Sequence, residues 1–252
     1  MDVFLSPYPQ GVEKLPSAVS TDSLDDLLAM SKVAVTIPLT DKISIDGNIP
    51  FNVAQPTPRS IILRQVEFSH AAFNSLTIEL FQNGSARLYL PFPFLPALPD
   101  AMPIESPHVR EVFNRIRRGS MAGDVSQLRF FDVEALILHL TILISFYKHW
   151  LGDLPPIFKM EVAASLTNVW RAVPFLDSDE WGKHVQRYGL PVVGSKQVWV
   201  GLSKGEGLRI PWGSDAAEWQ VLSGFIFLGF GMPVNAYASS LATVVWKASQ
   251  KS

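Results

Sequence analysis

The chain lacks cysteine altogether, although it is 252 residues long. It therefore has no disulfide framework, no thiolate ligand for zinc and no thiol nucleophile, which excludes several large classes of secreted and redox proteins. None of its five histidines has a second ligand at metal-binding spacing. The sequence also contains no GxSxG or P-loop motif. We therefore expect no metal, no cofactor and no catalytic residues of a recognisable type.

Charge is also scarce. Charged residues make up 17% of the chain, against roughly 25% in an average soluble domain, and the mean hydropathy is +0.19. The excess of apolar residues indicates a surface buried in an assembly, contact with a membrane, or a large core. The net charge of -2 gives no general attraction to nucleic acid or anionic lipid, so such binding requires a local basic patch.

The N-terminus lacks the basic start and continuous apolar run of a signal peptide. We expect an intracellular, cytoplasmic location, with the periphery of a membrane as the alternative.

The most apolar well-bounded segment is residues 131–152, which predict one helix of about five to six turns. Asp132 is placed to cap its start, and Lys148 and His149 lie in its last turn, where the helix dipole favours positive charge. Because only a thin polar stripe runs along the segment, we expect the helix to be buried on most sides.

The N-terminal part predicts short elements. Residues 1–20 contain three prolines and predict an extended arm. Residues 21–30 carry leucines at i, i+3 and i+4 and predict a helix. From Lys32 onward, apolar alternation predicts a strand and then a hairpin that turns at Asp46-Gly47.

Residues 75–91 predict a second hairpin, whose register follows from its alternation. A two-residue Asn-Gly turn would mix the apolar and polar faces of the two strands. A three-residue turn with a left-handed glycine bulge keeps the faces separate, because it pairs Leu80 with Ala86 and Glu79 with Arg87. We therefore predict the three-residue turn.

Six prolines between residues 91 and 107 predict a connector between two lobes. Within it, Phe92, Phe94 and Leu95 are candidates for docking on the core or for a partner surface. A short helix capped by Ser106 follows. Its predicted buried residues are Val109, Val112, Phe113 and Ile116.

The pattern after Gly152 predicts strands at 154–166 and 169–176, a capped helix at 178–189, and a hairpin between Lys204 and Gly207. The segment 220–246 has no charged residue and is long enough to cross a bilayer. Because glycine, proline and asparagine interrupt its centre, we expect two packed helices, with a transmembrane span as the less favoured alternative.

Five arginines surround the helix after Ser106 and the loop beyond it: Arg110, Arg115, Arg117, Arg118 and Arg129. Arginine pairs well with phosphate groups, so this cluster is the candidate site for nucleic acid, an anionic membrane surface or an acidic partner. The alternative is a solvated helix face with cations near its C-terminus.

Together these patterns predict an α+β protein in which mainly antiparallel strands pack on a central buried helix, 131–152, and on C-terminal apolar helices. The predicted organisation is an extended arm (1–20), a β-rich N-terminal lobe (21–100) and an α+β C-terminal lobe (101–252), with one continuous domain as the alternative.

For function, the low charge and the absence of catalytic motifs favour a non-catalytic structural or interaction subunit. We expect it to act in a homo- or hetero-oligomeric assembly, with a protein or a second copy as partner. The first alternative is a binding module for nucleic acid or an anionic membrane surface that uses the arginine cluster. The second is an enzyme with a site assembled from scattered residues, with His139 or His184 as base.

Overall fold

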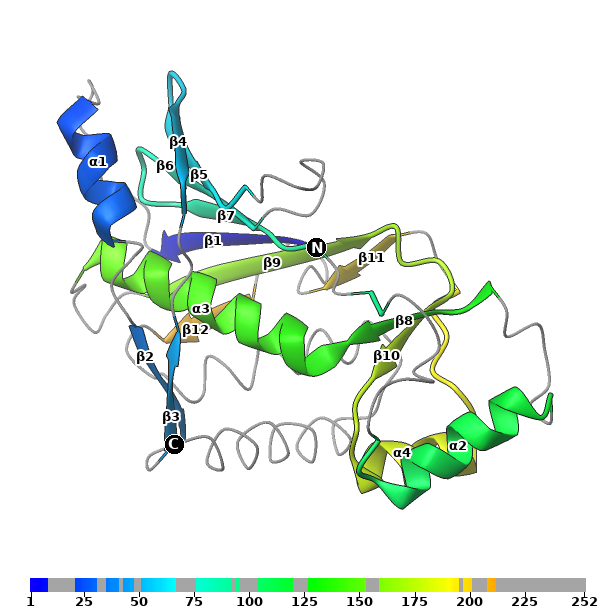
Figure 1. The fold of residues 1–252 in the computed structure, drawn as a ribbon. Helices are drawn as coiled ribbons and strands as arrows, with labels where there is room; N and C mark the ends of the chain where they lie inside the picture. Colours follow the sequence, from blue (N-terminus) through cyan, green and yellow to red (C-terminus); the bar gives the residue numbers. More distant parts are fainter. Residues whose placement is uncertain are drawn as a thin grey trace. The chain divides into compact units, whose positions relative to one another are not determined.

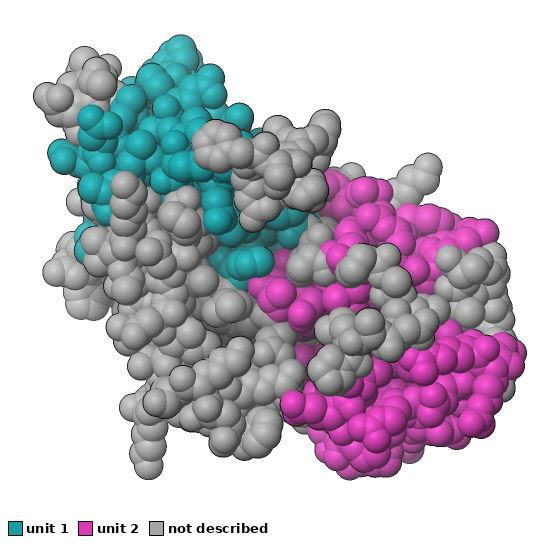
Figure 2. Space-filling model, viewed as in Figure 1, with its two compact units in different colours: residues 1–91, 138–166, 199–221 teal, residues 92–137, 167–198, 222–252 magenta. Residues whose placement is uncertain are grey.

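The computed structural model describes residues 1–8, 21–30, 35–40, 43–47, 51–66, 76–91, 94–95, 104–119, 127–152, 159–194, 197–200 and 208–211. These residues form a mixture of helices and strands, and most strand pairs are antiparallel, so the fold is of the α+β type. The chain divides into two compact units, coloured separately in Figure 2.

Each unit is assembled from three stretches of sequence. Unit 1 comprises Met1–Pro91, Leu138–Leu166 and Trp199–Val221, and unit 2 comprises Phe92–Ile137, Thr167–Val198 and Leu222–Ser252. The chain first changes unit after Pro91, where the proline-rich segment begins.

An eight-stranded sheet forms most of unit 1, with strand order β11-β9-β1-β7-β6-β5-β4 and β12 also paired with β9 (Figure 1). The strands are β1 (Asp2–Tyr8), β4 (Val53–Pro56), β5 (Ser60–Arg64), β6 (Thr77–Phe81), β7 (Ala86–Tyr89), β9 (Lys159–Thr167), β11 (Gln197–Val200) and β12 (Leu208–Pro211).

β1 lies between β9 and β7 and is antiparallel to both. The extended conformation predicted for residues 1–20 is therefore present over 2–8, but these residues belong to the sheet and not to an arm. The reason is their alternation, which buries Val3 and Leu5 in the core. Residues 9–20 lie outside the described part of the chain.

The β6–β7 hairpin has the predicted register. Leu80 pairs with Ala86, Gly84 has a φ of 79°, and the Gly84 amide donates to the Phe81 carbonyl at 3.0 Å. The three-residue turn is confirmed, and it places the apolar residues of both strands on one face. The buried residues of the sheet on that face include Val3, Leu5, Ile61, Leu63, Ile78, Leu80, Ala86 and Leu88, together with Met160, Val162, Ala164 and Leu166 of β9.

The long apolar helix is α3 (Val133–Leu151), and the strand before it is β8 (Arg129–Asp132). The helix begins two residues later than predicted, because Phe131 and Asp132 end the strand. Asp132 is nevertheless the predicted N-cap, since its carboxylate accepts a hydrogen bond from the Ala135 amide at 3.1 Å. The chain passes from unit 2 to unit 1 within this helix.

Among the described residues of unit 1, contacts of Tyr147 and Phe146 join α3 to the remainder of the unit. The Tyr147 side chain is fully buried, and its hydroxyl donates to the Gly84 carbonyl at 2.6 Å. The Phe146 ring meets the Phe51 ring edge-on, with 5.3 Å between centroids. The C-terminal half of α3 is therefore fixed to the β6–β7 turn and to the residues before β4.

α1 (Thr21–Met30) has the predicted bounds. β2 (Val35–Thr40) and β3 (Ile43–Gly47) form an antiparallel pair in which Val35 is opposite Gly47. The predicted turn at Asp46-Gly47 is wrong, because both residues lie in β3 and the chain reverses between β2 and β3. The Asp-Gly signal is local, whereas strand pairing is decided by which neighbouring strand is available.

Unit 2 contains a two-stranded parallel sheet of β8 and β10 (Ala172–Phe175), together with α2 (Pro107–Arg117) and α4 (Asp179–Tyr188). Both helices were predicted. Ser106 caps α2 by accepting from the Val109 amide, and Ser178 caps α4 by accepting from the Trp181 amide. All four residues predicted to be buried in α2 are buried.

The hairpin predicted across residues 204–207 is wrong. β11 and β12 each pair with β9, which is nine residues long; β12 occupies only its first half, Lys159 to Val162. The segment 220–246 lies outside the described residues, so the helices expected there stay a prediction. In the part of the chain that the structure describes, no helix is long and apolar enough to cross a membrane.

Candidate interaction surfaces

A chain of aromatic rings forms the core of unit 2. The Phe113 ring of α2 lies 5.4 Å from the Phe130 ring and 5.6 Å from the Phe175 ring, measured between centroids. The Trp181 ring of α4 lies 5.8 Å from the Phe175 ring. These contacts attach both helices to the β8–β10 pair.

The two helices approach closely where Gly182 faces His108. A Cβ added to Gly182 would lie 2.6 Å from the His108 Cβ and 2.7 Å from its carbonyl carbon. Only glycine fits this approach, so the orientation of α4 against α2 depends on it.

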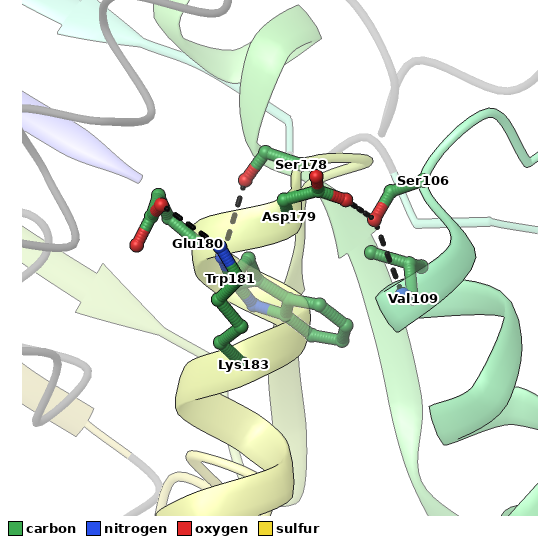
Figure 3. Close-up of polar contacts among 7 residues, drawn as sticks. All are labelled: Ser106, Val109, Ser178, Asp179, Glu180, Trp181 and Lys183. Carbon is green, nitrogen blue, oxygen red and sulfur yellow. Dashed lines mark hydrogen bonds and ion pairs between the residues drawn. The ribbon is translucent and has the colours of Figure 1, made fainter.

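The start of α4 is hydrogen-bonded to the residues that lead into α2, and Figure 3 shows the contact of Asp179 with Ser106. Asp179 Oδ1 accepts from Ser106 Oγ at 2.6 Å. The Asp177 carboxylate accepts from the Glu105 amide at 2.7 Å and from the Ser106 amide at 3.1 Å. These carboxylates thus accept hydrogen bonds from groups at the N-terminus of α2, where the helix dipole favours negative charge.

The candidate arginines of α2 have separate contacts. Arg110 Nη2 donates to the Ile104 carbonyl at 2.7 Å, and Arg115 pairs with Glu111 on the same helix at 3.1 Å. Arg117 and Arg118 are exposed at the C-terminal end of the helix. Arg110 and Arg117 lie about 10 Å apart along the helix axis. The arginines of α2 are therefore spread along the helix and do not form one compact cluster.

Arg129, the fifth candidate, lies in β8. Its guanidinium carbon lies 3.8 Å from the centroid of the Phe94 ring, and its Nη1 donates to the Asn168 carbonyl at 3.3 Å. Phe94 and Leu95 are half-buried against the same strand, since Phe94 forms a β-bridge with Phe131. Phe92 lies outside the described residues.

The histidines considered for catalysis belong to different units, His139 to unit 1 and His184 to unit 2. Burial lowers the pKa of His184, whose ring lies 5.0 Å from the Tyr188 ring. Over the described ranges, no three His, Asp or Glu residues gather as a group that would hold a metal ion.

One exposed surface of unit 2 was missed by sequence reasoning. Trp170 is 47% exposed and Tyr188 is 66% exposed. The Arg171 guanidinium carbon lies 5.9 Å from the Trp170 ring centroid, and that of Arg187 lies 5.1 Å from the Tyr188 ring centroid. The adjacent Trp-Arg and Arg-Tyr pairs were the available signal, but alternation around Trp170 predicted a strand, and a strand prediction does not identify exposed residues.

The second exposed surface is the outer face of the sheet in unit 1. Register places Phe4 beside Arg87, Arg87 beside Glu79 and Glu79 beside Ile62, so these four side chains form one row across the strands. Phe4 is 42% exposed. We call the surface formed by Asp2, Phe4, Ile62, Glu79, Phe81, Arg87 and Tyr89 the Phe4 face.

Rings and charges alternate on the Phe4 face. The Phe4 and Phe81 centroids are 6.4 Å apart, the Arg87 guanidinium carbon lies 4.6 Å from the Tyr89 ring centroid, and Arg87 pairs with Asp2 at 3.7 Å. Burial raises the pKa of Tyr89, and the Arg87 charge opposes this rise. The face therefore combines apolar area with charges of both signs.

No family model, curated protein or solved structure matches this chain. Its function has to be inferred from the surfaces described above.

Proposed function

We propose that the protein is a non-catalytic interaction subunit that self-associates through the Phe4 face. One observation carries the proposal: an aromatic side chain in the middle of a sheet, Phe4, is 42% exposed. The exposed face of an antiparallel sheet is ordinarily polar along its strands. An apolar patch on such a face is typical of an interaction site.

A second copy suits this face because its charges are mixed. Asp2 and Glu79 are acidic and Arg87 is basic, so two copies related by a twofold axis can place opposite charges against one another. Aromatic residues and arginine are enriched at protein interfaces, and the Phe4 face carries Phe4, Phe81, Tyr89 and Arg87. In this proposal the inner face of the sheet packs on α3 as the central helix and on the C-terminal helices.

The test is size-exclusion chromatography with light scattering at tens of micromolar. We expect an oligomer for the unchanged chain. Phe4→Ser should raise the dissociation constant about 30-fold or more, since truncating a central anchor costs about 2 kcal/mol. Trp170→Ser is the matched control, because Trp170 is exposed to a similar extent and belongs to unit 2. A monomeric unchanged chain, or equal effects of both substitutions, would refute the proposal.

A second candidate function is anionic binding through α2, where Arg117 and Arg118 are exposed at the helix C-terminus. It predicts binding to nucleic acid or to an anionic membrane surface that weakens steeply with salt and falls when both arginines become glutamine. Salt-independent binding would contradict it.

A further inference from the structure

The turn between β9 and β10 has an unusual backbone. Asn168 and Arg171 have φ values of 57° and 58°, in the left-handed region. For a residue with a side chain such as that of arginine, this conformation costs about 1–2 kcal/mol, and it persists only where the surroundings hold it.

Two backbone hydrogen bonds hold Arg171. Its amide donates to the Val193 carbonyl at 3.0 Å, and its carbonyl accepts from the Arg129 amide at 3.0 Å. The Arg171 side chain also donates to Gln127 Oε1. The turn is thus fixed from both sides, and the large apolar side chain that it exposes to solvent is Trp170.

Three arginines accompany the exposed rings. Arg129 and Arg171 are joined through their backbones at the turn, and Arg187 lies beside Tyr188 on α4. Within the described part of the chain, none of these three arginines forms an ion pair with a carboxylate. Their guanidinium groups lie over aromatic rings instead, at 3.8 to 5.9 Å from the centroids.

Tyr188 is connected to the turn along the chain through Val193, which accepts the hydrogen bond from the Arg171 amide. Val193 is five positions after Tyr188, so the two Cα atoms are at most about 18 Å apart. Val192, between them, is 43% exposed. We call the surface formed by Arg129, Trp170, Arg171, Arg187, Tyr188 and Val192 the Trp170 strip.

The acidic residues that the structure describes on α4 and just before it lie at the N-terminal end of that helix. Asp177 and Asp179 are engaged with α2, and Glu180 pairs with Lys183 at 3.5 Å. Asp179 begins the helix and Tyr188 ends it, about 13 Å away along the axis. Among the residues that the structure describes, the three arginines of the Trp170 strip therefore have no carboxylate partner.

We propose that the Trp170 strip binds single-stranded nucleic acid, with bases stacked on Trp170 and Tyr188 and phosphates bound by Arg129, Arg171 and Arg187. Exposed aromatic rings interleaved with arginine provide the two contacts that a single strand offers, a π-face and a phosphate. A duplex is a poorer ligand because its bases are already stacked on each other. This proposal is independent of self-association through the Phe4 face.

The test is fluorescence anisotropy of the full chain with a labelled twelve-nucleotide oligothymidylate, starting at about 50 mM salt. We expect binding whose logarithmic affinity falls with logarithmic salt concentration with a slope of about -2, from three phosphate contacts on a single strand. Trp170→Ala should weaken binding about 5- to 150-fold, the range for loss of one stacked base. Trp170→Phe retains a ring and should restore most of the affinity.

The charge control compares two pairs of arginines. Replacing Arg171 and Arg187 by glutamine should lower the salt slope by about 1.4, whereas the same replacement of Arg117 and Arg118 should leave it unchanged. Phe4→Ser should leave the affinity unchanged even where it abolishes self-association.

Several results would overturn the proposal. They are no binding of the oligonucleotide, equal affinity for a twelve-base-pair duplex, and loss of binding when Arg117 and Arg118 are replaced but not when Arg171 and Arg187 are replaced. Binding only to vesicles of phosphatidylserine and phosphatidylcholine in equal parts would also overturn it, in favour of a membrane surface.

Discussion

Tyr147→Phe removes one hydroxyl and nothing else from the core of unit 1. The hydroxyl donates to the Gly84 carbonyl at 2.6 Å, and the Tyr147 side chain is 0% exposed. Because Gly84 is also buried, the substitution leaves its carbonyl without this donor in a place that water does not reach. The expected loss in the free energy of unfolding is about 1–3 kcal/mol at pH 7.

The same substitution has a signature in alkaline solution. Burial raises the pKa of Tyr147 above its ordinary value, so the native state keeps the proton while the unfolded state ionises near pH 10. Above pH 10 the unfolded state binds fewer protons, and the free energy of unfolding falls as pH rises. The unchanged chain should lose about 1.4 kcal/mol from this group at pH 11, and the phenylalanine variant should lose none of it.

Urea unfolding followed by circular dichroism at pH 7 and pH 11 measures both effects. The stability difference between the two chains should shrink by about 1.4 kcal/mol between the two pH values. Other lysines and tyrosines also titrate in this range, but they are common to both chains and cancel in the difference. A difference under about 0.5 kcal/mol at pH 7, or one that stays constant with pH, would refute the buried hydrogen bond.

Three further predictions concern unit 2. Gly182→Ala should lower the free energy of unfolding by about 1–3 kcal/mol through overpacking, while Gly194→Ala, whose added Cβ meets nothing within 4 Å, should be neutral; equal melting temperatures would contradict this. Asp177→Ala should cost about 1–2 kcal/mol, as for loss of a helix cap, measured by thermal melting, and an unchanged transition would count against the cap. The pKa of the His184 imidazole, measured by NMR, should lie below its ordinary value of 6.5, because burial disfavours the charged form. The contribution of this group to the free energy of unfolding is then present above pH 6.5 and is lost on acidification. A pKa at or above 6.5 would contradict this prediction.

Local patterns in the sequence predicted those elements whose determinants are local. The ends of α2 follow from Ser106, Pro107 and Gly119, and the hairpin register follows from alternation around one left-handed glycine, Gly84. Each of these features involves residues within one turn of a helix or one pair of strands. The capping role of Asp132 was predictable for the same reason.

Pairings between distant segments were not predictable in this way. β1 pairs with β9, more than 150 residues away in sequence, and no pattern within residues 2–8 distinguishes a central strand from an extended arm. The hairpin predicted between β11 and β12 is wrong, because both strands pair with the open edge of β9.

The candidate sites show the same division. Five arginines were identified by residue type, but of these only Arg129 lies in the Trp170 strip, because the strip combines segments distant in sequence, which backbone hydrogen bonds join at Arg129, Arg171 and Val193. The Phe4 face could not be predicted from the sequence, for a related reason. Alternation shows that Phe4 and Val3 face opposite sides, and it does not show which side is buried when both carry apolar residues.

Each unit is assembled from stretches that are distant in sequence. Truncated fragments are therefore unsuitable for assigning these functions. A fragment ending at Pro91 retains β1 and the Phe4 side chain but lacks β9, so one edge of β1 loses its hydrogen-bond partner. An unpaired strand edge promotes association by itself, and such a fragment would imitate self-association through the Phe4 face. Substitutions at Phe4 and Trp170 keep every strand in place and change one exposed side chain each. The comparison of these two variants therefore tests both surfaces, and truncation tests neither.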